Sequence, residues 1–310
     1  MKRIGVVGLG LNNPYFYAPL LREFDARVTH VWDYTLENAQ AYADRFDCEP
    51  VRSIDDFPDV DGVLVDSRNC DHIPLGRRFM ERGIPVFLEK PLSHSTQEAL
   101  DFLGEAEGKA VFSASPLRLA PTYVKMMRDV EAVEEPVVRC HVTVYHTMEF
   151  FVKDPIKCWH DDPAQSGGMM VDIGIHAVEL MNMFMKKPIA SVTGVASRCF
   201  YHEARCPDNY AVTITYEDGS LGTISLLCAT KRTDYSVEVL TPSHVFINNM
   251  DSEYTGLPEW NVDNAYGGFW GTIKAFVQMI DTGRPPVPPQ ETRRNFELLE
   301  KIERAMKRGR

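Results

Sequence analysis

Three short segments of this 310-residue chain carry residues that can do chemistry only in combination. Gly8 and Gly10 follow the first apolar run, and glycines so spaced between a strand and a helix are typical of a turn that binds dinucleotide phosphates. Lys90 ends a later apolar run with an ammonium group, and Asp172 and His176 add a carboxylate and an imidazole further on. Together these residues predict a nicotinamide cofactor facing proton-transfer groups, as hydride transfer from an alcohol requires.

The elements that must position these residues begin with an alternating pattern. Short β-branched runs predict strands at residues 3–7, 27–32, 62–65, 85–88 and 110–113, and helical spacing predicts helices at 14–24, 36–46, 73–81 and 96–107. Helices between successive strands imply right-handed crossovers and a parallel sheet covered on both faces. We therefore predict an α/β domain, a doubly wound Rossmann sheet, over residues 1–120.

The pattern changes after residue 121. A helix is predicted at 122–129, strands at 137–147, 190–200, 210–216, 221–227 and 235–240, and two closing helices at 269–280 and 296–306. Asp218-Gly219 predicts a hairpin with a tight primed turn, because both residue types tolerate positive φ. Residues 121–310 are thus predicted to form an α+β domain with a largely antiparallel open sheet, for substrate binding and oligomerisation. Its last helix is a candidate to pack back on the first domain.

At the cofactor end, Asn13 occupies the third glycine position of the fingerprint. It is expected to cap the following helix, with Pro14 at the first helical position. Asp33 ends the second predicted strand about twenty residues later, where a carboxylate hydrogen-bonds the ribose hydroxyls; a solvated aspartate at a strand end is the alternative. No Lys or Arg lies between Asp33 and Asp44 to bind a 2′-phosphate, which favours NAD over NADP.

At the chemical end, Lys90 is expected at the carboxyl edge of the parallel sheet, where ligands of such sheets bind. It can donate to the reacting oxygen and stabilise alkoxide charge, whereas the plainer interpretation is a surface lysine with a packed stem. Asp172 lies four residues before His176, so one helix face would carry both side chains. His176 is the expected proton acceptor; a satisfied interior histidine beside a helix-capping aspartate is the alternative.

Bulk composition excludes several classes of partner. The formal charge of −11 argues against nucleic acid and against an anionic membrane surface. No apolar run approaches the length of a membrane span, and the start lacks a cleavage site, so a mature cytoplasmic protein with reduced cysteines is expected. His160, Asp161 and Asp162 are metal-type ligands, but their spacing does not recur, so no metal is predicted.

With these residues in hand, the chain resembles the Gfo/Idh/MocA oxidoreductase family, which includes inositol dehydrogenases and glucose–fructose oxidoreductase. Residues 60–72 are similar to the family's fourth-strand segment, and residues 83–91 to its Glu-Lys-Pro signature. Residues 167–176 are similar to its second-domain motif, and residues 283–286 to a common C-terminal turn. The likeness therefore covers nearly the whole chain.

Departures from the family pattern concern the ligands. Arg68 stands where the family has Pro, and it is expected either to bind a phosphate or, as we favour, to point to solvent. Trp159-His160 stands where many relatives have Trp-Arg, which leaves the charge and hydroxyl pattern of the substrate open. Glu179 replaces a frequent Asp, a mild change.

The resemblance implies an NAD-dependent dehydrogenase that acts on a sugar, inositol or related polyol as a homodimer or homotetramer. Lys90, Asp172 and His176 would be catalytic and, with Trp159 and His160, would contact the substrate; Tyr145 and His146 are further candidates for the substrate wall. The residues implied at the cofactor are Gly8, Gly10, Asn12, Asn13, Asp33, Ser67, Asn69, His72, Glu89 and Lys90. For His72, cofactor contact and capping of the next helix are equally open.

Three alternatives stay open. A regulator that keeps the cofactor domain as a sensor is expected to have lost Lys90, Asp172 and His176, which are present here. A hydrolase or epimerase that retains NAD for transient oxidation fits the same residues. An enzyme that reduces a cyclic dihydrodiol, an imine or a tetrapyrrole would need a more apolar pocket.

Overall fold

A parallel sheet forms the first half of the molecule in the computed structural model, which describes residues 1–154, 157–249 and 268–308. The six strands lie in the order β3-β2-β1-β4-β5-β6, and every pair is parallel. They are β1 (Lys2–Val7), β2 (Ala26–Trp32), β3 (Glu49–Pro50), β4 (Gly62–Val65), β5 (Val86–Leu88) and β6 (Val111–Phe112). The predicted doubly wound sheet is confirmed; β3, two residues long and not apolar, was not predicted.

Helices cover both faces of this sheet, as the buried apolar runs of β4 and β5 require. They are α1 (Asn13–Leu21), α2 (Leu36–Phe46), α3 (His72–Glu81) and α4 (Thr96–Glu105), with short 3-10 turns η1 (Arg22–Phe24), η2 (Ile54–Asp56) and η3 (Asn69–Asp71). The prediction of one helix over residues 14–24 was wrong at its end, because α1 tightens into η1 after Leu21. The first cluster of chemical residues therefore lies where β1 meets α1.

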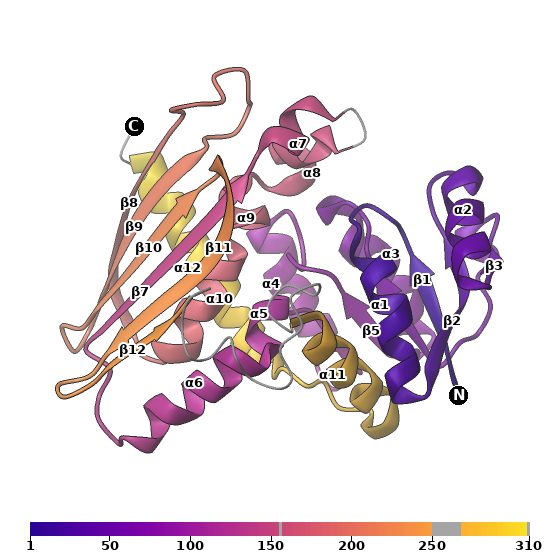
Figure 1. Ribbon diagram of the computed structural model, residues 1–310, viewed down its shortest axis with the longest axis horizontal. Coiled ribbons are helices and arrows are strands. Elements are labelled where there is room, and N and C mark those ends of the chain that lie inside the picture. Colours follow the sequence, from indigo (N-terminus) through magenta and orange to yellow (C-terminus); the bar gives the residue numbers. More distant parts are fainter. Residues whose placement is uncertain (155–156, 250–267, 309–310) are drawn as a thin grey trace.

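A second six-stranded sheet has the order β12-β11-β7-β10-β9-β8. Its strands are β7 (Arg139–Thr147), β8 (Ile189–Ser197), β9 (Asn209–Tyr216), β10 (Leu221–Leu227), β11 (Ala229–Leu240) and β12 (Val245–Asn248). Only the β7–β10 pair is parallel, so the predicted largely antiparallel sheet is confirmed. Figure 1 shows the two sheets at opposite ends of the molecule with helices between them.

The predicted hairpin joins β9 to β10, but its turn type was predicted wrongly. Gly219 has φ +84, whereas Asp218 is not among the residues with positive φ. Gly219 N donates to Tyr216 O, and Tyr216 N donates to Ser220 O. The loop is therefore one residue longer than a two-residue primed turn, and within it only Gly219 adopts the left-handed conformation.

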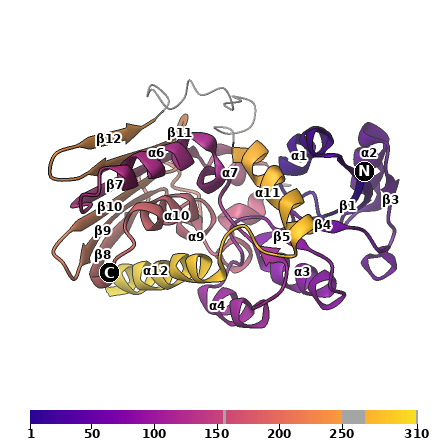
Figure 2. The ribbon, with the colours of Figure 1, turned by 90° about the horizontal axis from the view of Figure 1, so that it is seen from below.

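The helices of the second half link the two sheets. They are α5 (Pro116–Leu119), α6 (Pro121–Ala132), α7 (Glu149–Lys153), η4 (Cys158–Asp161), α8 (Pro163–Ser166), α9 (Met169–Asp172), α10 (Ile175–Phe184), α11 (Gly268–Thr282) and α12 (Pro289–Arg308). Helix α12 packs against β8, α10 and α4, and α11 packs against α1 and α5 (Figure 2). Both closing helices thus contact elements of the first half.

The segment that carries Asp172 and His176 is not one helix. Helix α9 ends at Asp172, and α10 begins at Ile175 after Ile173 and Gly174. The single helix expected over Asp172 and His176 was therefore wrong, because a turn at Ile173 and Gly174 separates α9 from α10. Over the described part of the chain, no helix combines the length and the apolar character needed to span a membrane.

Candidate active site

A cavity of about 160 Å³ lies between the two halves of the molecule. The glycine-rich turn and the start of α1 contribute Leu11 and Asn13 to its wall, and the end of β5 contributes Lys90. The second half adds three imidazoles, those of His146, His160 and His176. Groups predicted at the cofactor and groups predicted at the substrate therefore share one cavity.

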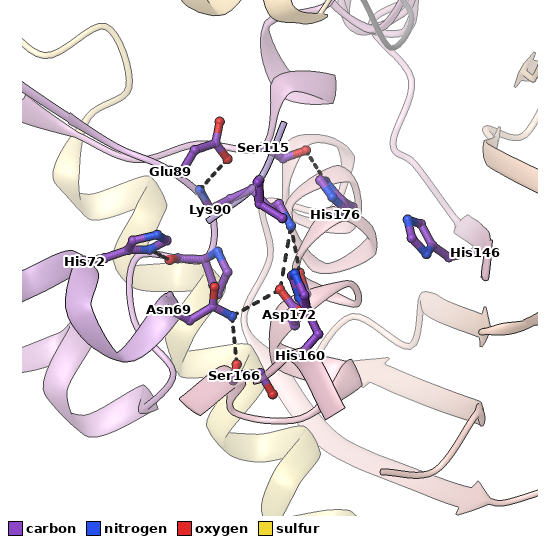
Figure 3. A network of polar contacts seen from close by, with 12 residues as sticks. Asn69, His72, Glu89, Lys90, Ser115, His146, His160, Ser166, Asp172 and His176 are labelled. Atoms are coloured by element: carbon purple, nitrogen blue, oxygen red, sulfur yellow. Dashed lines mark hydrogen bonds and ion pairs between the residues drawn. The ribbon is translucent and has the colours of Figure 1, made fainter. Parts of the chain in front are cut away.

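Lys90 lies at the carboxyl end of β5, as predicted, and is only 7% exposed. Its Nζ donates to the backbone oxygen of Asp172 at 3.2 Å and lies 3.8 Å from Asp172 Oδ1 (Figure 3). The alternative of a surface lysine is wrong, since the ammonium is buried against a carboxylate from the other half of the chain.

Asp172 is fully buried, and both of its carboxylate oxygens accept hydrogen bonds. Oδ2 accepts from His160 Nδ1 at 2.6 Å, and Oδ1 accepts from Asn69 Nδ2 at 3.1 Å. Burial alone would raise the pKa of Asp172, but the charges of His160 and Lys90 and these hydrogen bonds outweigh it and hold the pKa below its usual range. Asp172 therefore stays a carboxylate near neutral pH. The break before α10 explains why its imidazole partner is His160 rather than His176.

His176 also lines the cavity, but its partner is a hydroxyl. Its Nδ1 lies 2.7 Å from Ser115 Oγ, and its ring meets Tyr235 edge to face at 5.3 Å. Burial, and then the charge of Lys90, lower the pKa of His176 well below its usual value. The ring is therefore neutral at pH 7 and able to accept a proton. Ser115 was not predicted; Pro116 after it marks a helix start, and Ser115 does cap α5.

Two residues predicted at the cofactor have structural partners instead. The amide of Asn69 bridges Asp172 and the backbone oxygen of Ser166 at 2.9 Å. His72 is fully buried, with Nδ1 at 2.7 Å from Pro91 O and Nε2 at 3.1 Å from Ser67 O. Burial lowers the pKa of His72 to about 4. The capping interpretation of His72 was wrong, because its ring nitrogens lie against Pro91 O and Ser67 O and not at the start of α3, and its contact with the cofactor stays a prediction.

The glycine-rich turn packs closely against the end of β4. A Cβ on Gly8 would lie 2.7 Å from Asp66 O, and one on Gly10 would lie 2.8 Å from the carbonyl carbon of Ser67. Gly8 also has φ +87, a conformation that only glycine adopts readily. These two positions therefore require glycine. Ser67, also predicted at the cofactor, is buried and donates to Arg68 O at 3.3 Å.

The start of α1 differs from the prediction. Asn13 is the first residue of the helix rather than its cap, and the N-cap residue Asn12 makes no side-chain capping bond. The first-turn amides of α1 thus have no side-chain acceptor at the cap. The side chain of Asn13 instead bonds Tyr17 and Glu89. Burial raises the pKa of both groups, and the Asn13 hydrogen bonds oppose that rise.

Asp33 lies at the end of β2 beside the turn, as predicted. Its Oδ1 accepts from Leu9 N at 2.9 Å, and its Oδ2 accepts from Asn38 Nδ2 at 2.9 Å. The side chain thus joins the glycine-rich turn to α2. The alternative of a free, solvated aspartate is wrong, because the residue is only 7% exposed.

Arg68 was expected to point to solvent, but the structure gives it three partners. It forms an ion pair with Asp71 at 2.8 Å, lies 4.8 Å from the centroid of the Tyr34 ring and donates to Gln165 at 3.2 Å. A carboxylate and an aromatic face satisfy the guanidinium group locally. The Gln165 bond also ties the first half to α8.

Two buried carboxylic acids under the turn complete the cofactor end. Asp66, at the end of β4, accepts from Leu11 N at 2.9 Å, and its Oδ2 has no partner among the described residues. Glu89 accepts from Tyr17 and from Lys90 N, so it holds the Lys90 backbone and does not reach the cavity wall. Burial, and then the Glu89 charge, raise the pKa of Asp66 well above its usual range. Asp66 was missed, although it ends a strand just as Asp33 does.

The predicted substrate wall is only partly correct. His160 and His146 line the cavity, whereas Trp159 stacks on His160 with 3.6 Å between ring centroids, and Tyr145 is not in the lining. Asp161 accepts from the amides of Arg205 and Cys206. Within the described ranges, no group of three metal-type side chains lies close enough to hold an ion.

Comparison with known families agrees with this geometry. Residues 2–115 match the model of an oxidoreductase family with an NAD-binding Rossmann fold, and residues 137–241 match the GFO/IDH/MocA C-terminal domain. The chain belongs to the Gfo/Idh/MocA family. The description of the family is that of oxidoreductases with an NAD-binding Rossmann fold, and the family likeness drawn from the motifs is confirmed.

Relatives include dehydrogenases of polyols and sugars. The chain is 25% identical over 308 residues to the myo-inositol 2-dehydrogenase of Thermotoga maritima, covering 92% of this chain and 90% of that protein. It is 23% identical to the glucose-6-phosphate 3-dehydrogenase of Bacillus subtilis over 58% of this chain and 53% of that protein. The match to the Bacillus subtilis oxidoreductase YrbE spans 65% of that protein, so some curated relatives are matched over little more than half of their length.

Solved structures share the whole fold. GenD2 from gentamicin A biosynthesis, in complex with NAD, has a TM-score of 0.84 at 22% identity and covers 100% of this chain and 96% of its own. A putative myo-inositol dehydrogenase from Sinorhizobium meliloti has a TM-score of 0.84 at 19% identity, covering 100% and 98%.

The residues present fit NAD. The uncapped start of α1 offers amides and a positive dipole to a pyrophosphate, beside glycines where any Cβ would clash. Asp33 provides a carboxylate at the strand end where a ribose is held. Lys90 and the three imidazoles lie in the cavity that Leu11 and Asn13 border.

Proposed function

We propose that this protein is an NAD-dependent dehydrogenase that acts on a hydroxyl-bearing carbon of a sugar, inositol or related polyol. The observation that carries the proposal is the buried Lys90–Asp172 contact between the two halves, beside imidazoles and next to the glycine-rich turn. A buried cation held on a carboxylate inside a ligand cavity is typical of groups that act on a reacting oxygen. The names of the relatives support the same class of substrate.

Each polar side chain has a proposed step. When bound, NAD supplies the nicotinamide ring that takes hydride from the carbinol carbon. Lys90 donates to the oxygen of that carbon and stabilises its negative charge as the hydroxyl proton leaves. His176 accepts the proton at Nε2 when its Nδ1–H donates to Ser115 Oγ. Asp172 orients Lys90 and His160.

The test is direct. Purified protein with NAD is incubated with a panel of inositols, sugars and sugar acids while absorbance at the NADH band is followed. Net NADH production that depends on one class of polyol supports the proposal. Release of a hydrolysed or epimerised product without net NADH would favour the alternative in which NAD is retained for transient oxidation.

A second candidate substrate class is a cyclic diol with an apolar ring. Half of the residues that line the cavity are apolar, among them Leu117, Phe151, Ile173 and Phe269. The chain is 22% identical to a trans-1,2-dihydrobenzene-1,2-diol dehydrogenase from Oryctolagus cuniculus over 80% of both chains. Cyclic diols therefore belong in the same panel.

We also propose that the protein divides at residue 120 and assembles as a homodimer or homotetramer through its second sheet. This sheet carries exposed apolar side chains, among them Val195 in β8 at 64% and Val245 in β12 at 60% exposure. Light scattering of the purified protein measures the mass directly. A monomer at micromolar concentration would contradict the assembly without affecting the proposed reaction.

A further inference from the structure

One imidazole nitrogen of the cavity has an unused hydrogen-bonding position. His160 lines the cavity beside Lys90 and is 1% exposed. Its Nε2 is buried and has no hydrogen-bond partner in the part of the chain that the structure describes. A buried polar atom without a partner costs free energy, so such an atom in a ligand cavity points to a matching group on the ligand.

The plane of the His160 ring is fixed by its neighbours. Trp159 stacks on it with centroids 3.6 Å apart and planes 25° apart, and Phe151 stacks on it at 4.1 Å and 21°. Its Nδ1 donates to Asp172 Oδ2 at 2.6 Å. Two ring stacks and one short hydrogen bond leave the imidazole little freedom to turn, so Nε2 has a defined direction (Figure 3).

The chemical character of Nε2 follows from the Asp172 contact. Because Asp172 is held as a carboxylate, it can only accept from Nδ1, and the tautomer with its proton on Nδ1 carries its lone pair on Nε2. His176 differs, because its partner Ser115 is a hydroxyl that either donates or accepts. Of these two cavity imidazoles, only His160 has its tautomer set by a carboxylate.

We propose that His160 determines substrate specificity: its Nε2 accepts a hydrogen bond from a second hydroxyl, on the carbon next to the reacting carbinol. One carboxylate, Asp172, holds both Lys90 and His160, and on this ground the proposal assigns the two groups to oxygens on neighbouring carbons. The inference rests on the proposed function and narrows its substrate class to uncharged vicinal diols. A carboxylate or phosphate at that carbon would place an acceptor oxygen against the acceptor Nε2, and a deoxy compound would leave Nε2 without a partner.

The test compares matched alcohols that differ by that one hydroxyl. Oxidation of cis- and trans-1,2-cyclohexanediol and of cyclohexanol with NAD is measured for the unsubstituted protein, His160→Leu and His160→Gln. The unsubstituted protein is expected to prefer one diol over cyclohexanol by about 10- to 100-fold in kcat/KM. His160→Leu should lose that preference, mainly through KM for the diol. His160→Gln should keep part of it, because its amide oxygen can accept.

His141→Gln is the matched control, since His141 lies on the same strand as His146 but bonds Thr143 and Thr223. Unchanged NAD affinity and circular dichroism of both His160 variants at the assay temperature show that the fold is kept. Nitrogen-15 NMR gives a second measurement: in the NAD complex, the His160 signals should show a protonated Nδ1 and an unprotonated Nε2. A protonated Nε2 overturns the proposal.

The kinetic outcomes separate the two levels of inference. An equal loss for diol and cyclohexanol in His160→Leu would place His160 in the proton transfer and overturn its specificity role. An unchanged diol preference in that variant would overturn it as well, while leaving the proposed function intact. Failure of the unsubstituted, NAD-binding protein to oxidise any of these alcohols or the polyol panel would contradict the proposed function itself.

Discussion

The two ends of the cleft each bury an aspartate, but they shift its pKa in opposite directions. Asp172, at the chemical end, is 0% exposed, and Asp66, at the cofactor end, is 1% exposed. The pKa of Asp172 is held below its usual range, whereas the pKa of Asp66 is raised well above it. Burial therefore does not decide the protonation state by itself.

The partners explain the difference. Asp172 faces Lys90, His160 and the Asn69 amide, so cations and donors surround both of its oxygens. Asp66 receives one backbone hydrogen bond and faces the Glu89 carboxylate, and Asp33 adds a further like charge. The free-energy cost of desolvating the carboxylate is offset by the partners of Asp172, but it is not offset at Asp66.

This contrast suits the two tasks. A fixed negative charge at Asp172 holds Lys90 and His160 in place for a reacting oxygen. A raised pKa favours the protonated form of Asp66 under the glycine-rich turn, and that form opposes the negative phosphates that the start of α1 attracts less than a carboxylate would. The predictions below test the two ends in turn.

Removal of the cation at the chemical end should have the largest effect. Lys90→Ala is expected to lower turnover by about a thousandfold or more, because the oxygen loses its charged donor in a buried site. NAD affinity, measured by calorimetry, should stay within about twofold. Lys153→Ala, at an exposed lysine paired with Glu149, is the control. Turnover that persists in Lys90→Ala would remove Lys90 from the reaction.

The next effect should come from removing the charge of Asp172. Asp172→Asn leaves Lys90 without its counter-charge in a buried site, which is expected to lower the free energy of unfolding by about 3 kcal/mol at pH 7.5. Because the folded pKa of Asp172 is lowered, its stabilisation is present above the unfolded pKa and is lost as the pH falls through the folded value.

Urea denaturation at several pH values measures this directly. Asp56→Asn, at an exposed residue outside the cavity, is the control. The difference between Asp172→Asn and the unsubstituted protein should shrink as the pH falls. A stability equal to that of the unsubstituted protein at pH 7.5 would mean that the carboxylate is not paired, and the comparison would fail at this end.

At the cofactor end, Asp33 should govern the choice of dinucleotide. Asp33→Ala is expected to weaken NAD by about 30-fold, on the order of 2 kcal/mol, and to relax discrimination against NADP. Asp33→Asn keeps an acceptor for Leu9 N and separates the ribose contact from support of the turn. Asp44→Ala is the control. Equal NAD affinity in Asp33→Ala would exclude a ribose contact.

Much of the fold could be predicted because its signals are local. The helix at residues 36–46 and the strands at 62–65 and 221–227 were predicted at their observed bounds. Apolar runs and helical spacing determine such elements without help from distant residues. Some short elements without a clear apolar pattern, such as β3 and α7, lack that signal and were missed.

The structure brings the predicted chemical residues together, but in pairs that the sequence did not predict. Lys90, His160 and His176 line the cavity and Asp172 contacts Lys90, whereas spacing alone had linked Asp172 to His176. The break at Gly174 sends Asp172 to His160 instead, and a contact between residues 12 apart across a turn has no periodic signature. Ser115 depends on chain segments 61 residues apart, so only the fold brings it to His176.

The smallest effect, and the sharpest test of the comparison, concerns Asp66. Asp66→Asn keeps an acceptor for Leu11 N and cannot ionise, so it should stabilise the protein at pH 8 by about 1 kcal/mol or more. Because the folded pKa is raised, Asp66 contributes full stability below its unfolded pKa, and this is lost as the pH rises through the folded value. The gain in Asp66→Asn should therefore shrink toward pH 5, again with Asp56→Asn as control. A loss of stability at pH 8 would show that Asp66 is a paired carboxylate like Asp172.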